Sequence, residues 1–344
     1  MLQYFQPAES FITESGVALR LTLAYATYGS LNADKSNVVW VCHALTANAF
    51  VADWWPGVVG EGCVLNPKSH FVVCANILGS CYGTEIELAD TAGKTDLQKG
   101  FPLLTIRDMV AAHILLRRHL GISKIALLAG GSMGGYQVLE WAFLEPEVPQ
   151  RLLLLATSAA ESAWGIAIHE AQRMAIEADP TWKETGVNAG SAGLQAARAI
   201  GMLTYRNHAL FATQQSEEEM NKTDGFRAAG YQRYQGEMLA RRFSAKNYWQ
   251  LTKSLDTHNI ARHRTASLAE ALQQIVQPAL IIGISSDLLC PVSEQQLLAA
   301  HMPCATLVEI DSPFGHDGFL VEHVAICNAV RKWLQKETSG VIII

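Results

Sequence analysis

Residues 127–142 read LLAGGSMGGYQVLEWA, an apolar run joined to a helical pattern by a glycine-rich turn. Within this stretch, Gly130-Gly131-Ser132-Met133-Gly134 matches G-x-S-x-G, the pattern of a sharp strand-to-helix turn that exposes a serine nucleophile. A glycine-rich turn that only packs, or that cradles a phosphate, is the alternative. Neither G-x-G-x-x-G nor G-x-x-x-x-G-K-[ST] occurs in the chain, which weakens the nucleotide-binding alternatives. We therefore predict that Ser132 is a nucleophile at the carboxyl end of a strand.

Short apolar runs recur on both sides of this turn and alternate with helical patterns. The runs cover residues 38–42, 71–78, 124–130, 151–156, 279–285 and 305–310. Helices are predicted over residues 133–145, 292–302 and 317–336, and Thr105-Ile-Arg-Asp108 has the form of a capped helix start. Continuous apolar runs of this length indicate strands that are buried on both faces. The alternation predicts an α/β protein with a mostly parallel central sheet and helices on both faces.

Residues 161–269 interrupt this alternation. They contain no convincing strand and are rich in Ala, Gln, Arg and Tyr. The segment holds 13 of the 26 Lys and Arg and 11 of the 32 Asp and Glu, so its net charge is +2 while the rest of the chain carries −8. We predict a helical cap, or lid, over 161–269 that is inserted into an α/β domain formed by residues 1–160 and 270–344.

Composition excludes several classes of protein. The 344 residues are 49% hydrophobic and 17% charged, which is incompatible with disorder over the bulk of the chain, and the net charge of −6 gives no overall footprint for nucleic acid. The longest apolar stretches are far shorter than the ~20 residues needed to cross a membrane. The start of the chain lacks the pattern of a signal peptide. Seven cysteines without a C-x-x-C pair suggest neither a zinc site nor a disulfide framework, so a cytoplasmic protein is expected.

A nucleophilic serine needs a base and an acid that orients the base, and in this kind of turn they follow in the order Ser, Asp or Glu, His. Asp287 lies just past the apolar run in IIGISSDLLCP, and His316 follows the next run in SPFGHDGFLVE. Both are therefore expected at the sheet edge where Ser132 lies. Asp311 is a rival for the acid, and a turn-capping role is the alternative for Asp287.

Two backbone N–H groups are needed to hold the oxyanion of an acyl-transfer reaction. Met133, the residue after the nucleophile, is expected to supply one of them. The second is expected from Leu45, in the loop that follows the run at 38–42. His43 in the same loop is interpreted as structural.

The motifs VCHALTAN, DWWPGVVG, CANILGSCYG, FPLLTIRDMV, GGSMGGYQVLEWA, YQRYQGEMLARRF, LTKSLDTHN, SSDLLCP and SPFGHDGF, in this order and spacing, resemble the homoserine O-acetyltransferase family. The resemblance covers about residues 15–335. It implies the α/β-hydrolase fold and acyl transfer from acetyl-CoA to L-homoserine in methionine biosynthesis. It also implies that no metal or bound cofactor is required, and that the chain forms a homodimer through the cap.

The resemblance also assigns residues. Ser132, Asp287 and His316 match the catalytic triad, whereas Arg198, Tyr205 and Asp317 match positions that hold the amino acid. A guanidinium such as that of Arg198 grips a carboxylate in two places, and Asp317 offers a charge for an ammonium group. From the residues alone, the structural interpretations are preferred: a solvated arginine for Arg198, core packing for Tyr205, and the first turn of a helix for Asp317.

One stretch departs from the family pattern. Glu85-Ile86-Glu87 stands where the family has a turn with Gly-Pro, so two carboxylates are gained in a loop at the expected ligand-binding edge. This change is either a solvated variant turn or an alteration of donor or acceptor choice. A serine acyltransferase, a succinyl-CoA-dependent enzyme, a plain esterase and a binding protein that only retains the fold therefore remain as alternatives.

The positive balance of the cap suggests a further hypothesis. Arg227, Arg233, Arg241 and Arg242 include candidates for contacts with the phosphates of CoA, since arginine suits phosphate geometry. The alternative is that these arginines lie on solvated helices.

Overall fold

The computed structural model of the chain describes residues 1–89 and 102–339. In this part of the chain one sheet has the strand order β1-β3-β5-β4-β7-β8-β9-β10, and β2 and β6 pair with β3. The strands are β1 Gln3–Phe5, β2 Phe11–Ile12, β3 Ala18–Tyr28, β4 Val38–Cys42, β5 Phe71–Ala75, β6 Glu85–Leu88, β7 Leu127–Gly131, β8 Leu152–Leu155, β9 Ala279–Ile284 and β10 Ala305–Ile310. The strands from β5 to β10 along this order are parallel. The predicted α/β class and mostly parallel sheet are confirmed.

Helices cover both faces of β4, β5, β7, β8 and β9, which explains why these strands are apolar and buried along nearly their whole length. These helices are α1 Val51–Trp54, α2 Ile106–His119, α3 Met133–Leu144, α9 Leu268–Gln273, α10 Val292–His301, α11 Gly318–Val321 and α12 His323–Ser339. Trp40 of β4 packs on one face in a core that includes Trp141 of α3, with the ring centroids 5.0 Å apart. Val41, the next residue, faces the opposite core with Trp55 and Val330. Successive side chains of one strand therefore pack into the two hydrophobic cores on opposite faces of the sheet. The prediction that the run at 305–310 is also buried on both faces was wrong, because β10 is the edge strand and only its Ile310 is buried.

The antiparallel strands at the start of the chain were not predicted. β3 pairs antiparallel with β1, β2, β5 and β6, and it carries the eleven residues ALRLTLAYATY. Polar residues such as Arg20 and Thr22 interrupt the apolar run that marks a strand buried on both faces. β3 was therefore missed by a search for such runs, although its alternating burial is typical of an antiparallel strand.

Two predicted boundaries were wrong. The run at 71–78 gives a strand only to Ala75. The Asn76 N–H still donates to the Ala24 carbonyl of β3 at 2.8 Å, while its side-chain oxygen accepts a hydrogen bond from the Ala49 N–H at 2.7 Å. The single helix predicted over 317–336 is divided into a 3₁₀ turn, Gly315–Asp317, followed by α11 and α12. The capped start at Thr105 is confirmed, since its side chain accepts from the Asp108 N–H and the Asp108 side chain reciprocates.

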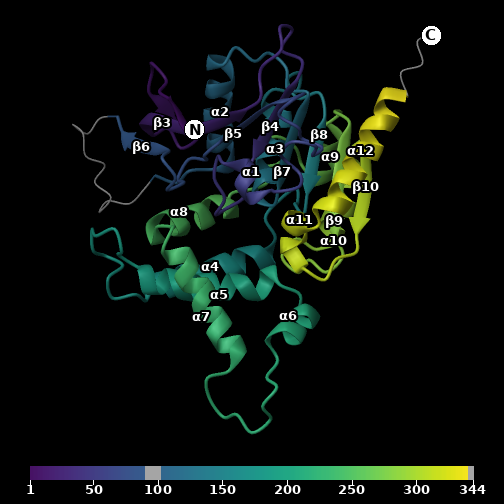
Figure 1. Cartoon of the computed structure of the whole chain (residues 1–344). Helices are drawn as coiled ribbons and strands as arrows, with labels where there is room; N and C mark the ends of the chain where they lie inside the picture. The colour runs from purple at the N-terminus through teal and green to yellow at the C-terminus, as the bar shows by residue number, and fades with distance from the viewer. Residues whose placement is uncertain (90–101, 340–344) are drawn as a thin grey trace.

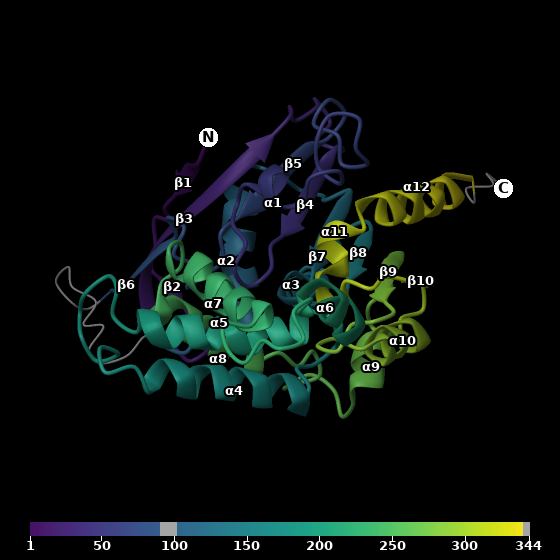
Figure 2. The same cartoon turned by 60° about the horizontal axis from the view of Figure 1, so that its bottom comes forward.

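Between β8 and β9 the chain forms α4 Ala163–Glu177, α5 Ser191–Tyr205, α6 His208–Gln215, α7 Arg227–Ala240 and α8 Ala245–Asp256. We call residues 161–269 the helical segment. Figure 1 shows its helices grouped below the sheet, and Figure 2, with that side brought forward, shows α4, α5 and α7 lying side by side. The remainder of the described chain is the sheet domain. No helix in the described part of the chain is long and apolar enough to span a membrane.

Candidate active site

Ser132 lies in the sharp turn between β7 and α3, where its backbone is strained. Its φ of 54° and ψ of −128° fall in a region that side-chain-bearing residues rarely adopt. The Ser132 N–H donates to the carbonyl of Leu155 at 2.9 Å, and the Thr157 hydroxyl donates to the Ser132 carbonyl at 2.9 Å. Bonds from the neighbouring strand therefore hold the strained conformation.

The glycines around Ser132 permit this turn by their lack of a side chain. A Cβ atom at Gly134 would lie 2.2 Å from the carbonyl oxygen of Cys42, and one at Gly131 would lie 2.5 Å from the Phe319 ring. Both distances are impossible for real carbon atoms. At Gly130, the first glycine of G-x-S-x-G, a Cβ atom would lie 2.3 Å from the carbonyl oxygen of Gly134. Both glycines of the pattern are therefore required by the close approach of α3 to the ends of β4 and β7.

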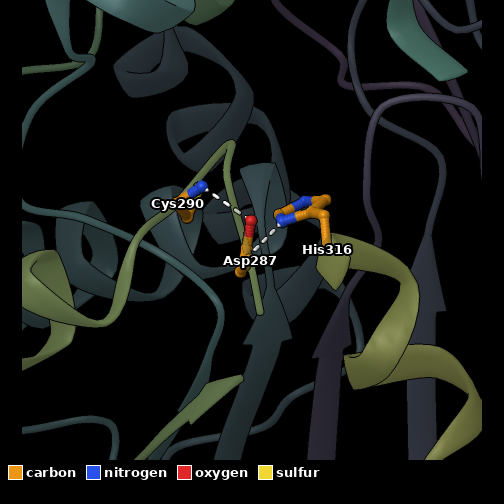
Figure 3. Close-up of side chains that lie close together, drawn as sticks. All are labelled: Asp287, Cys290 and His316. Carbon is orange, nitrogen blue, oxygen red and sulfur yellow. Dashed lines mark hydrogen bonds and ion pairs between the residues drawn. The ribbon is translucent and has the colours of Figure 1, made fainter. Parts of the chain in front are cut away.

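Ser132, His316 and Asp287 form a continuous chain of hydrogen bonds. His316 Nε2 lies 2.9 Å from Ser132 Oγ, and His316 Nδ1 lies 2.7 Å from Asp287 Oδ2. The other Asp287 oxygen accepts the N–H groups of Leu289 and Cys290, at 2.8 and 2.9 Å, and Figure 3 shows the carboxylate between Cys290 and His316. The structure brings together the three residues that the sequence singled out.

The rival acid, Asp311, lies away from this chain of bonds. Its carboxylate accepts a hydrogen bond from the Ser285 hydroxyl at 2.9 Å, and the residue is exposed. Asp287, by contrast, is buried directly beneath His316. Of the two candidate acids, only Asp287 is positioned to orient the imidazole.

Opposing effects set the pKa of His316. Burial lowers the pKa, but the charge of Asp287 and its hydrogen bond to Nδ1, together with the charges of Asp317 and Glu161, raise the pKa above its ordinary value. The same bond to Nδ1 leaves Nε2 free of a proton and directed at the Ser132 hydroxyl. The imidazole is therefore arranged to accept a proton from that hydroxyl.

The loop after β4 is held by a buried histidine. The Ile77 N–H donates to His43 Nε2 at 3.1 Å, so Nδ1 carries the proton and donates to the Ala44 carbonyl at 2.8 Å. Burial lowers the pKa of His43 to about 4, which keeps the ring neutral. Leu45, in this loop, and Met133 line the same cavity as Ser132. This arrangement suits the predicted oxyanion role of their N–H groups, which stays a prediction.

A cavity of about 360 Å³ opens over Ser132. Its walls come from the loop after β4, the start of α3, the loops after β8, β9 and β10, and helices α4, α5 and α8. The switch in strand order between β4 and β7 lies beside the cavity, which is where ligands bind in open parallel sheets. The sheet domain and the helical segment thus enclose one site.

The three residues expected to hold an amino acid all line this cavity. The Arg198 guanidinium lies over the Tyr205 ring, 5.2 Å from its centroid. The Asp317 carboxylate is already paired with Arg206, at 3.2 Å. Burial raises the pKa of Asp317, and the charge of Arg206 opposes that rise.

Sequence reasoning missed Arg206, although it directly follows Tyr205 in the motif AARAIGMLTYR. Arg206 is the residue that ends α5, directly after Tyr205. Since Tyr205 was already expected in the site, its neighbour in sequence could also have been considered. Glu161 and His169 were also missed, and both line the cavity. Glu161 follows β8 in the chain, just as Asp287 follows β9. The argument that predicted Asp287 from its position after a strand could therefore have predicted Glu161, whereas His169 lies within α4.

Of the four arginines considered for CoA phosphates, only Arg242 lines the cavity. It donates to the Thr46 carbonyl at 2.8 Å and to the Tyr82 hydroxyl, which connects the helical segment to the loop after β4. Arg241 lies 3.7 Å from Glu237 and is largely exposed. Arg227 lies 3.9 Å from Glu218, also at the surface.

Glu85 and Glu87 do not line the cavity. They lie in β6, where Glu87 is opposite Arg20 of β3 with a nitrogen–oxygen distance of 3.3 Å. The stretch that departs from the family pattern is therefore a strand paired with β3, outside the walls of the cavity that holds Ser132.

Within the described residues, one group of side chains has the composition of a metal site, namely Asp287, Cys290 and His316. Its carboxylate and imidazole are already engaged with each other and with Ser132. Burial raises the pKa of the Cys290 thiol well above its usual range, so the thiol stays protonated and is a poor ligand. The chemistry of these three side chains therefore suits the hydrogen bonds that they form with Ser132 and with each other better than it suits a metal site.

Residues 37–323 match the family model described as the alpha/beta hydrolase fold. A solved structure titled homoserine O-acetyltransferase from Bacillus anthracis superposes with a TM-score of 0.87 at 22% identity, covering 97% of this chain and 96% of that one. The structure titled esterase E22 gives a TM-score of 0.84, also at 22% identity, with 97% and 99% covered. These structures and the family model establish the α/β-hydrolase fold, in which Ser132 occupies the sharp turn between β7 and α3.

Relatives in sequence identify the family within this fold. A curated protein of Cyclobacterium marinum named homoserine O-acetyltransferase is 43% identical over 93% of this chain and 92% of its own length. One of the same name from Chlorobium luteolum is 42% identical over 97% and 94%. The chain belongs to the homoserine O-acetyltransferase family.

Proposed function

We propose that this chain transfers an acetyl group from acetyl-CoA to the hydroxyl of L-homoserine through an acyl-enzyme on Ser132. The hydrogen-bonded chain Ser132–His316–Asp287, opening into a cavity that also holds Arg198, is the observation that carries the proposal. The names of relatives at about 40% identity support homoserine as the acceptor.

In the first half-reaction His316 takes the proton of the Ser132 hydroxyl as Oγ attacks the thioester carbonyl. The backbone N–H groups of Met133 and Leu45 hold the oxyanion. Collapse of this intermediate breaks the carbon–sulfur bond. The CoA thiolate leaves with the proton from His316, and the acetyl group remains on Ser132.

In the second half-reaction the homoserine hydroxyl gives its proton to His316 and attacks the acyl-enzyme. The carbon–Oγ bond then breaks, and Ser132 recovers the proton. Water competes with the alcohol at this stage, so the helical segment must exclude water while it admits the amino acid. Arg198 lies in the cavity wall and suits the substrate carboxylate, with Tyr205 stacked beneath its guanidinium and Asp317 next to the base.

The decisive experiment measures thiol release from a panel of acyl-CoAs, each with homoserine, serine or water as the acceptor. We expect acetyl-CoA with L-homoserine to be fastest and initial-rate plots to give the parallel lines of ping-pong kinetics. Intersecting lines would refute the acyl-enzyme. Preference for serine or for succinyl-CoA would move the assignment to a related O-acyltransferase.

A plain esterase is the second candidate, because structures titled as esterases share this fold at TM-scores of 0.84 and above. The charged groups Arg198, Arg206 and Asp317 in the cavity favour an amino-acid acceptor instead. Ester hydrolysis that is fast and unaffected by added homoserine would support the esterase.

We also propose an oligomeric state, a pathway and a cellular compartment for the enzyme. Trp164, Met174 and Leu203 of the helical segment are 57–62% exposed, and these apolar side chains support a homodimer formed through this segment. Sedimentation of the purified protein tests that arrangement. We place the reaction in methionine biosynthesis in the cytoplasm, with no bound cofactor and acetyl-CoA as the co-substrate.

A further inference from the structure

Glu161 places a second carboxylate in the wall of the cavity, apart from Asp317. It follows β8 and immediately precedes Ser162, the capping residue of α4. One carboxylate oxygen accepts the Tyr136 hydroxyl at 3.1 Å, and the other accepts the Ser162 N–H at 3.1 Å. Tyr136 is itself stacked on the buried His258, with ring centroids 3.8 Å apart. The carboxylate is therefore held in one orientation.

Tyr136 also sets where this carboxylate lies relative to the chemistry. It belongs to the first turn of α3, whose capping residue is Ser132, and its backbone N–H donates to the Ser132 carbonyl at 3.3 Å. Glu161 is thus tied through Tyr136 to the turn that carries the nucleophile. Its charge also contributes to the raised pKa of His316, so the two groups are within electrostatic reach.

The charge of Glu161 is not balanced by an ion pair, in contrast to the other acids of this region. Asp317 pairs with Arg206, and Asp256 pairs with Arg173 at 2.7 Å. Within the described ranges 1–89 and 102–339, no ion pair joins Glu161 to a basic side chain. Burial raises the pKa of Glu161, and the nearby His169 and the Tyr136 hydrogen bond only partly oppose that rise. A cation in the cavity would supply the missing counter-charge.

The proposed acceptor carries such a cation. Homoserine presents a carboxylate and an ammonium group near its hydroxyl, and the cavity offers Arg198 for the first of these. We propose that Glu161 binds the ammonium group of the amino-acid acceptor and so determines selectivity for amino acids over other alcohols. This inference rests on the proposed function. Glu161 would act in addition to Asp317, whose carboxylate already forms an ion pair with Arg206.

The test compares two acceptors, L-homoserine and 4-hydroxybutyrate, which is the same alcohol without the amino group. The measured quantity is the ratio of their kcat/KM values with acetyl-CoA as donor. In Glu161→Gln we expect this ratio to fall about 10- to 100-fold, the usual value of a hydrogen bond to a charged group. Glu161→Asp keeps the carboxylate but moves it away from the cavity, because its side chain is one methylene shorter. We expect the ratio to fall less in this variant, through a higher KM for homoserine alone.

Glu184→Gln is the matched control, since Glu184 is an exposed acid of the same segment and does not line the cavity. It should leave the ratio unchanged. A ratio within twofold of wild type in both Glu161 variants, or an equal loss for the two acceptors, would overturn the inference and leave the proposed function standing. A wild-type enzyme that makes no homoserine ester would overturn both. If Glu161→Gln does not fold, the Glu161→Asp ratio decides.

Discussion

The sheet domain and the helical segment contribute to one cavity in different ways. Ser132, Asp287 and His316 all follow parallel strands of the sheet, and hydrogen bonds between neighbouring strand ends hold their loops. Arg198 and Tyr205 lie on α5 of the helical segment, which also contains helices with little burial of their own. α6 has no buried residue, and α7 buries only Gly236 and Leu239.

This difference assigns separate tasks to the two regions. Groups that exchange protons must keep their geometry to a fraction of an ångström, and the sheet domain provides that rigidity. In the proposed function, the groups that bind the acceptor lie on the helical segment, which must admit and release it. Substitutions in the sheet domain should therefore reduce kcat or overall stability, whereas substitutions in the helical segment should have smaller effects.

The largest effect is expected from Ser132→Ala, because the acyl-enzyme cannot form without Oγ. We expect kcat for acetyl transfer to fall by about 10⁴-fold or more. Covalent labelling by a fluorophosphonate probe should disappear in the same variant, with its unfolding curve close to that of wild type. A variant that transfers at the wild-type rate would refute the proposed mechanism.

Asp287→Asn should be nearly as damaging, by about 10⁴-fold in kcat, because the amide stabilises the wrong tautomer of His316. Asp311→Asn is the matched control on the neighbouring strand end. Among the residues that the structure describes, its carboxylate accepts a side-chain hydrogen bond only from the Ser285 hydroxyl, so kcat should stay near the wild-type value. Equal losses in the two variants would remove Asp287 from its proposed role.

The pH profile gives a smaller and more specific effect. His316 accepts a proton only when neutral, and its pKa is raised above the ordinary 6.5. We expect kcat/KM to fall about tenfold for each pH unit below that raised pKa. In Asp287→Asn the strongest of the charges that raise this pKa is removed while burial remains, so the acid limb measured on the residual activity should move to lower pH. A limb that stays in place would show that another group controls it.

Sequence reasoning placed residues correctly where one local pattern determines the backbone conformation. The G-x-S-x-G turn needs glycine at 134 for backbone contact, so its residues predict the elbow and Ser132 together. Asp287 and His316 followed from their positions after strands. The partners of these groups were not predictable in the same way, because the pairing of Arg206 with Asp317 joins segments more than a hundred residues apart. β3 was missed because it mixes exposed and buried positions.

Gly134→Ala tests the tight packing of the sheet domain. The added methyl carbon would lie 2.2 Å from the Cys42 carbonyl oxygen, so α3 must shift away from β4. We expect the free energy of unfolding to fall by about 1–3 kcal/mol, as in other overpacked cores. Urea unfolding measures this change. A loss below about 0.5 kcal/mol would mean that the elbow is more adaptable than its contacts indicate.

Gly230→Ala is the corresponding change in the helical segment and should have the opposite sign. Gly230 lies within α7, and a Cβ atom there would meet nothing within 4 Å. Alanine lowers the entropy cost of helix formation, so we expect a gain of about 0.5–1 kcal/mol in the free energy of unfolding, with kcat unchanged. The same urea titration as for Gly134→Ala provides the comparison. A loss of stability together with weaker self-association would instead show that this face of α7 is covered by a second copy of the chain, where an added methyl group has no room.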